Sequence, residues 1–348
     1  MPIKRIWVMF KARNYEFFRD KASFGWNFLF PFLLVAGFGI LFGGREITEY
    51  KVGVFPAPAG ALEVSAIDIP AGLRETRYLQ FVGFASRDEA LAKLRHHKID
   101  FVIQAGPPPH HYWISDGSPK GYLVEKIFQA GQVPPEALHS VLKGRVASNP
   151  IRYIDWLFPG ILAMNMMFSA LWGVGYVVVR YRKNGTLRRL KATPLTAFEY
   201  LTAQMLSRLF LLMFTLTVVW FGCDLIFNFN VAGSLVDIFL VFFVGSLSLA
   251  ALGLVLAARG VSEEFTTGIL NFISWPMMFL SEVWFSLEGA PEWVRQAAQV
   301  FPLTQLLQGV RKIANDGATL GGVLPEIGIL AAMALLFLLL GAYLFSWD

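Results

Sequence analysis

The sequence is poor in charge and in cysteine, and it lacks several common catalytic motifs. Only 16% of its 348 residues are charged, whereas a typical soluble domain has about 25%. The single cysteine, Cys223, excludes an intrachain disulfide. The sequence contains no G-x-x-x-x-G-K-[ST] phosphate loop, no H-E-x-x-H and no G-x-S-x-G. We therefore do not expect this chain to hydrolyse ATP through a phosphate loop of its own.

Apolar residues are plentiful instead. Hydrophobic residues make up 55% of the chain, and phenylalanine occurs 32 times. A soluble fold of this size could not bury so much apolar surface, so we expect a bilayer around part of it. A helix needs about 20 apolar residues to cross a bilayer. Six such runs predict an all-α polytopic membrane protein with six transmembrane helices, at 24–43, 157–179, 200–221, 234–258, 269–285 and 324–345.

Basic residues gather at the edges of these runs. This placement suits anionic lipid headgroups rather than nucleic acid. They cluster before the first run, in the loop 180–194 and at Arg259, whereas the connection 222–234 has no Lys or Arg. The positive-inside rule therefore predicts that both termini and the loop 180–194 are cytoplasmic. We expect a multi-pass protein of a bacterial inner membrane.

The first 23 residues alternate apolar and basic positions with a helical period. Ile6, Phe10 and Phe17 fall near one face, while the lysines and arginines point elsewhere. We expect residues 1–23 to form an amphipathic helix in the cytoplasmic interface, followed by the first span at 24–43. The alternative is a basic flank without fixed structure.

Residues 44–152 are polar and rich in turn signals, which predicts a small extracytoplasmic α/β domain inserted after the first span. Ser86 and Glu89 fit a capping box at the start of one helix. The predicted strands are 51–55, 78–84, 100–105 and 111–115, and the predicted helices are 86–97, 120–131 and 135–148. Two histidine pairs, 96–97 and 110–111, lack companion ligands and are interpreted as polar surface, so no metal site is expected.

Titratable residues inside the apolar runs are few. Arg208 lies about two turns into the third run, and its long side chain can reach the cytosolic interface. A proton-driven carrier usually buries a carboxylate or histidine near mid-membrane. Asp155, Asp237 and Glu282 all stand near the ends of runs. The energy for any transport is therefore expected from a partner.

The loop 180–194 contains a short amphipathic segment. Gly185 and Pro194 bracket about two helical turns, in which Leu187 and Leu190 share a face. Such a helix fits a groove on a soluble partner, which the two leucines would fill. The alternative is a solvated basic loop that only fixes the topology.

Two stretches resemble the permease subunits of type-2 ABC exporters. In the loop, the matching residues are Gly185, Thr186, Leu187, Leu190, Thr193 and Pro194. Around the fifth run, they are Phe279, Leu280, Ser281, Pro291, Trp293, Pro302, Leu303, Thr304 and Arg311. Three positions depart from the pattern: Lys183 replaces a usual glutamate, Glu282 a common glycine and Ser286 a common proline.

The resemblance implies a dimer of permeases, as a homodimer or with a close paralogue, on separate cytoplasmic ATPase subunits that bind ATP and Mg²⁺. It implies a cytoplasmic coupling loop at 180–198 within the membrane part, 153–348, and an external re-entrant segment at 286–322. The implied coupling residues are Gly185, Thr186, Leu187, Arg188, Arg189, Leu190, Thr193 and Pro194. The implied gate residues are Ser281, Glu282, Pro291 and Pro302. The implied substrate path, on spans two and five, offers Met164, Asn165, Phe168, Asn271 and Phe272.

Hydrogen bonding between helices is the alternative role for the two asparagines of that path. The expected function is export of a hydrophobic or amphipathic compound by alternating access, with ATP hydrolysis on the partner. A membrane-anchored sensor or scaffold and a secondary carrier are the alternatives. The sequence leaves a drug, a lipid, a peptide and a glycan open as substrates.

Overall fold

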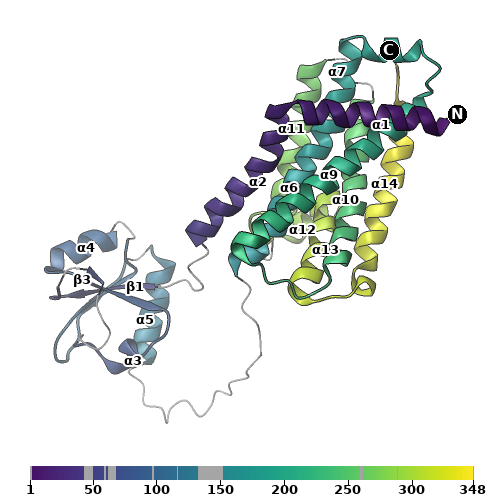
Figure 1. Cartoon of the computed structure of the whole chain (residues 1–348). Helices are drawn as coiled ribbons and strands as arrows, with labels where there is room; N and C mark the ends of the chain where they lie inside the picture. Colours follow the sequence, from purple (N-terminus) through teal and green to yellow (C-terminus); the bar gives the residue numbers. More distant parts are fainter. Residues whose placement is uncertain are drawn as a thin grey trace. The chain divides into compact units, whose positions relative to one another are not determined.

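The computed structural model divides the chain into two compact units, one of 1–44 with 150–348 and the other of the inserted residues 45–149. Figure 1 labels many of their helices and strands. The residues that the structure describes are 2–42, 50–58, 60–61, 68–95, 98–115, 117–131, 152–258, 260, 262–287 and 289–347. Arg259, the histidine pair 96–97 and the predicted helix 135–148 lie outside them.

The first unit is helical. Its elements are α1 (Pro2–Arg19), α2 (Lys21–Phe42), α6 (Tyr153–Ala170), η3 (Leu171–Tyr176), α7 (Val177–Lys183), α8 (Thr186–Lys191), α9 (Ala197–Phe227), α10 (Leu235–Ala257), α11 (Glu263–Leu280), α12 (Glu292–Ala298), α13 (Pro302–Asp316), η4 (Leu320–Val323) and α14 (Leu324–Leu344). The helix α1 crosses the end of the bundle at which α7 lies, and α12 and α13 lie toward the opposite end (Figure 1).

Four helices of the described chain are long and apolar enough to cross a membrane: Tyr153–Lys183, Ala197–Phe227, Leu235–Ala257 and Leu320–Leu344. The pair α1 and α2, bent by 62°, makes a fifth candidate if it counts as one span. The predicted run 269–285 corresponds to α11, which has 18 residues and carries two glutamates in its first turn. Its polar start and its end at Leu280 keep α11 below the length and hydropathy of the others, so a sixth span stays a prediction.

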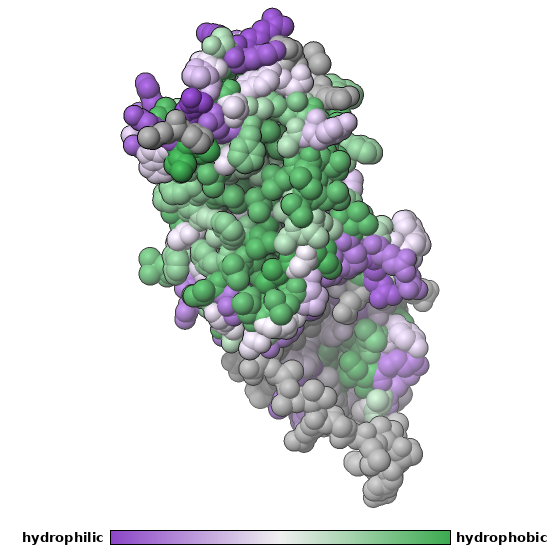
Figure 2. All heavy atoms as spheres, turned by 90° about the vertical axis from the view of Figure 1, so that its right-hand side faces the viewer, coloured by the Kyte–Doolittle hydropathy of each residue, from purple (hydrophilic) through white to green (hydrophobic). Residues whose placement is uncertain are grey.

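The outside of the helical unit matches a bilayer environment. Figure 2 shows a broad apolar surface on one side of the unit, with hydrophilic residues gathered at one end. Leucines of α14 contribute to the exposed surface, and Leu335 and Leu339 are about 60% exposed. Lipid tails are as apolar as these side chains, so such exposure is the expected arrangement for a membrane protein.

The helix α1 has the predicted amphipathic form. Phe10 packs edge-on against Phe210 of α9, and Phe18 packs against Phe214. Lys4 and Lys11 are exposed. The described residues 2–19 are therefore a helix docked on α9 rather than a flank without structure.

The inserted unit has a five-stranded sheet with strand order β2-β3-β1-β4-β5. Its strands are β1 (Tyr50–Phe55), β2 (Gly60–Ala61), β3 (Leu79–Gly83), β4 (Phe101–Gln104) and β5 (Tyr112–Trp113). The central strand β1 runs parallel to β3 and β4, and both edge strands are antiparallel. Such short edge strands limit the pairing of the sheet with another chain.

Helices cover both faces of this sheet. The helix α4 (Arg87–Arg95) buries Ala90 and Leu94 with Val102 on one face. On the other face, α3 (Ala71–Arg74) and α5 (Pro119–Ala130) enclose Val52 and Phe101. One of the two bonds of the predicted capping box is present, because Ser86 Oγ accepts a hydrogen bond from the Glu89 amide at 3.4 Å.

Candidate functional site

A six-residue π-helical segment, η3, interrupts the long helix Tyr153–Lys183 between α6 and α7. Such segments inside α-helices are rare and are often found at functional sites. Glycine allows η3 to pack closely on α10, because a Cβ on Gly175 would lie 3.2 Å from the Gly253 carbonyl oxygen. The segment therefore has a fixed position in the core while its other side faces a cavity.

This cavity has a volume of about 730 Å³ and lies among α1, α2, α6, η3, α9 and α11. Its aromatic lining comes from Phe17, Trp26, Phe30, Phe168, Trp172, Tyr176, Trp275 and Trp284. Its charged lining comes from Arg13, Glu16, Asp20, Arg180 and Arg208. A large apolar wall with a few convergent polar groups is the usual composition of a small-molecule site.

Hydrogen bonds between helices organise the polar part of the wall. Asn165 Nδ2 donates to the Asn27 carbonyl oxygen at 3.4 Å, and Ser169 Oγ donates to Asn27 Oδ1. Gln204 Nε2 donates to the Gly173 carbonyl oxygen at 3.2 Å. These bonds join α2, α6, η3 and α9 around one space. Asn165 thus both lines the cavity and bonds to another helix.

Arg208 of α9 extends into the cavity. Its guanidinium lies directly over Gly173, where an added Cβ would be only 1.9 Å from Arg208 Cζ. The Nε atom is buried and has no hydrogen-bond partner among the described residues. The sequence interpretation, a side chain that reaches the interface, did not anticipate the contact with η3.

The predicted path residues fall into two groups. Met164, Asn165 and Phe168 of α6 line the cavity. Asn271 and Phe272 of α11 do not: both are exposed on the outside of the helical unit, Phe272 to 78%. The next two residues, Ile273 and Ser274, are half-buried and buried, so the inward side of α11 carries other side chains than the predicted pair.

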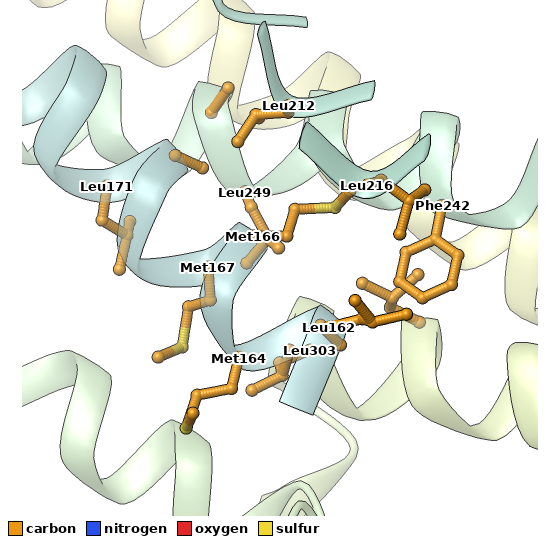
Figure 3. Close-up of a cluster of buried hydrophobic side chains, with 14 of the residues drawn as sticks. Leu162, Met164, Met166, Met167, Leu171, Leu212, Leu216, Phe242, Leu249 and Leu303 are labelled. Atoms are coloured by element: carbon orange, nitrogen blue, oxygen red, sulfur yellow. The ribbon is translucent and has the colours of Figure 1, made fainter. Parts of the chain in front are cut away.

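The other methionines of α6 belong to the core. Met166 lies among Leu212, Leu216 and Leu249, and Met167 is fully buried (Figure 3). Apolar side chains from α6, α9 and α10 thus close the core behind the cavity wall. This packing holds the cavity-lining face of α6 in position.

The second half of the site is the loop after α7. Gly185 adopts a left-handed conformation, φ +68°, that reverses the chain into α8. Arg188, Arg189, Thr193 and Pro194 are exposed. Leu187 is 0% exposed and belongs to the hydrophobic core of its own unit. The expectation that Leu187 fills a groove on a partner is therefore wrong for this structure, because its side chain already has a complete internal environment.

Buried and paired side chains fasten the loop to the helices around it. Arg182 donates to the Ala258 carbonyl oxygen at 2.9 Å and to the Ser346 carbonyl oxygen at 2.8 Å. Arg5 of α1 donates to the Pro194 carbonyl oxygen and pairs with Glu199 at 3.6 Å. The first turn of α9 is closed by a capping box between Thr196 and Glu199, which its T-x-x-E sequence signals.

Two further ion pairs join α7 to its neighbours. Arg180 pairs with Glu16 of α1 at 3.0 Å, and Lys183 pairs with Glu263 of α11 at 3.4 Å. Glu263 also accepts a hydrogen bond from the Tyr176 hydroxyl at 2.8 Å. Lys183, which replaces the usual acid of the resembled pattern, thus has a partner of opposite charge on α11.

One of the predicted gate residues, Glu282, contacts an arginine at the opposite end of the helical unit. Arg311 of α13 stacks over Trp156, donates to the Glu282 carbonyl oxygen at 2.8 Å and lies 3.8 Å from Glu282 Oε2. Ser281 hydrogen-bonds Thr304 at 2.9 Å, two residues after Pro302 begins α13. Pro291 stands apart from this group and is exposed before α12.

Comparisons with known proteins identify the family of this chain. A family model described as "ABC-2 family transporter protein" matches residues 21–343. The chain is 24% identical over 188 residues to the probable multidrug ABC transporter permease YbhR of Escherichia coli K12. The aligned region covers 53% of this chain and 51% of YbhR. The chain thus spans about half the length of YbhR. It is 23% identical to the probable multidrug ABC transporter permease YbhS over 98% of this chain and 94% of that protein. The extent of the family match shows that the chain belongs to the ABC-2 family of transporter proteins.

Proposed function

We propose that the chain is the permease subunit of an ATP-driven exporter that moves a hydrophobic or amphipathic compound out of the cell by alternating access. One observation carries this proposal: α6, η3 and α7 form one continuous helical stretch that lines the cavity and leads directly into the exposed loop. A movement of the loop would therefore change the shape of the cavity. A separate ABC ATPase, with ATP and Mg²⁺, would supply that movement.

The loop offers the ATPase a polar contact surface. Arg188, Arg189, Thr193 and Pro194 are its exposed members. Leu187 instead anchors α8 to the core, so that a force on the exposed side would pass to α7 as to a rigid body. The ion pairs to α1 and α11 would carry the same force to two further walls of the cavity.

The cavity wall favours an amphipathic substrate. Aromatic and methionine side chains provide adaptable apolar contact, while Asn27, Asn165 and Gln204 provide oriented polar groups. The relatives YbhR and YbhS are named as probable multidrug permeases. That description fits a site which selects by polarity and size more than by exact shape.

The exposed face of α11 is proposed to meet a second permease copy. Asn271 presents an exposed amide there, and the rings of Phe265 and Phe272 on the same helix are exposed as well. An amide facing lipid is costly, whereas an amide at a helix–helix contact can be hydrogen-bonded. The homodimer and the pair with a close paralogue both satisfy this requirement.

Reconstitution with the ATPase tests the proposed function. The purified chain alone should show no nucleotide hydrolysis and no uptake of an amphipathic dye into inverted vesicles. The complex with its ATPase should take up the dye only with ATP and Mg²⁺. Uptake by the chain alone along an ion gradient would instead establish a secondary carrier, and dye binding without uptake in either preparation would favour a sensor.

A further inference from the structure

The side chains that line the cavity carry more positive than negative charges. Three arginines and two carboxylates line it. Glu16 is already engaged by Arg13, Arg180 and the Tyr181 hydroxyl. Asp20 lies at the α1–α2 bend. The remaining cation, Arg208, makes no ion pair with either carboxylate among the described residues.

The position of Arg208 is built rather than accidental. Its guanidinium lies in a space that exists because residue 173 has no side chain, and that residue belongs to the π-helical segment η3. Gln204, one turn before Arg208 on α9, hydrogen-bonds the Gly173 carbonyl oxygen at 3.2 Å and so fixes α9 against η3. A guanidinium presents five N–H donors in a planar fork that matches a carboxylate or phosphate.

A cation in a membrane protein needs a partner. An arginine within a membrane-spanning segment is costly unless it is paired or faces water. Polar donors and acceptors, including Asn27, Ser169 and Ser207, surround the same space, while tryptophans form its apolar wall. The cavity therefore combines a cation with aromatic surface, which is the complement of an amphiphile with a negative head.

We propose that the cavity binds amphiphiles with an anionic head group, a carboxylate or phosphate, whose head is held by Arg208 and whose chain lies against the aromatic wall. This inference rests on the proposed function and names its substrate class. A charge-assisted bidentate pair in a site of low dielectric constant is among the stronger polar interactions in proteins. Such a pair would give hydrogen-bond acceptors to the buried Nε–H of Arg208 and to the other N–H groups of the same guanidinium.

Tryptophan quenching by a matched probe pair tests this assignment. The full chain in phosphatidylcholine nanodiscs is titrated with spin-labelled stearate or with its methyl ester, at about pH 9, where a carboxyl in a bilayer is ionised despite its raised pKa. Trp26, Trp172, Trp275 and Trp284 line the cavity and report occupancy. Wild type should be half-quenched at an about tenfold lower concentration of the acid than of the ester, as one charge-assisted hydrogen bond implies.

Variants separate the role of the charge from partition into the bilayer. Arg208→Gln should abolish the preference for the acid, and Arg208→Lys should keep part of it. Arg77→Gln removes an exposed arginine of the inserted unit and should leave the preference unchanged. If Arg208→Gln fails to fold by circular dichroism, the comparison of acid with ester in wild type and Arg208→Lys still decides.

The outcomes distinguish this inference from the proposed function. Equal quenching by acid and ester in wild type overturns the anionic preference and leaves the amphiphile site standing. Quenching by neither probe overturns the proposed site itself. With the preference present, displacement of the acid by phosphatidylglycerol in the nanodisc identifies a bilayer lipid as the occupant, and its failure to displace identifies a free amphiphile.

Discussion

Lys183 and Glu263 join the end of α7 to the first turn of α11. Both side chains are partly exposed, so their ion pair is worth about 0–1 kcal/mol and weakens with salt. Lys183→Glu should therefore lower the ATPase rate of the reconstituted complex moderately, because two carboxylates would then face each other. The double exchange Lys183→Glu with Glu263→Lys should restore the rate at low salt, and a double variant no better than the single one would contradict the pairing.

Asn165 and Asn271 are matched amides in different surroundings. Asn165 lines the cavity, whereas Asn271 is exposed on α11. Asn165→Ala should lower substrate-stimulated ATPase about two- to tenfold, the equivalent of one hydrogen bond of about 0.5–1.5 kcal/mol, with basal ATPase unchanged. Asn271→Ala should leave this stimulation intact and weaken association between copies. If both variants lost stimulation equally, a position in the cavity wall would not explain the effect of Asn165→Ala.

At the scale of elements, α8 combines a buried side with an exposed side. Leu187→Ala should destabilise the permease by about 2–5 kcal/mol, seen as a lower melting temperature, because the leucine is fully buried. Leu187→Met keeps the volume and should cost less than about 1.5 kcal/mol. Arg189→Ala should leave the melting temperature unchanged and weaken ATPase binding in a salt-dependent manner. If Leu187→Ala kept its normal stability but lost ATPase binding, Leu187 would have to contact the ATPase rather than the core.

The same scale explains which features a sequence can predict. Strands such as Tyr50–Phe55 and helices such as Pro119–Ala130 carry a clear period and turn signals, and the prediction located them within one or two residues. The strand Gly60–Ala61 is too short to carry a period. The π-helical turn of η3 has no sequence signature, and the contact of Arg208 with Gly173 depends on how α9 packs on η3. The basic loop after α7 was located from composition. The inward orientation of Leu187 depends on tertiary packing, which an amphipathic pattern alone does not determine.

At the scale of the whole molecule, two exposed apolar faces of the helical unit have different expected neighbours. The face of α14 around Leu335, Leu336 and Leu339 is aliphatic, which suits lipid, whereas α11 exposes Asn271 together with aromatic rings. In a background with the buried Cys223 replaced by alanine, Phe272→Cys should form disulfide-linked dimers in membranes under mild oxidation. Leu335→Cys, which is similarly exposed, should remain monomeric because its face meets lipid. Cross-linking at Leu335→Cys alone would move the contact between copies to α14, and cross-linking at neither position would remove the proposed contact through α11.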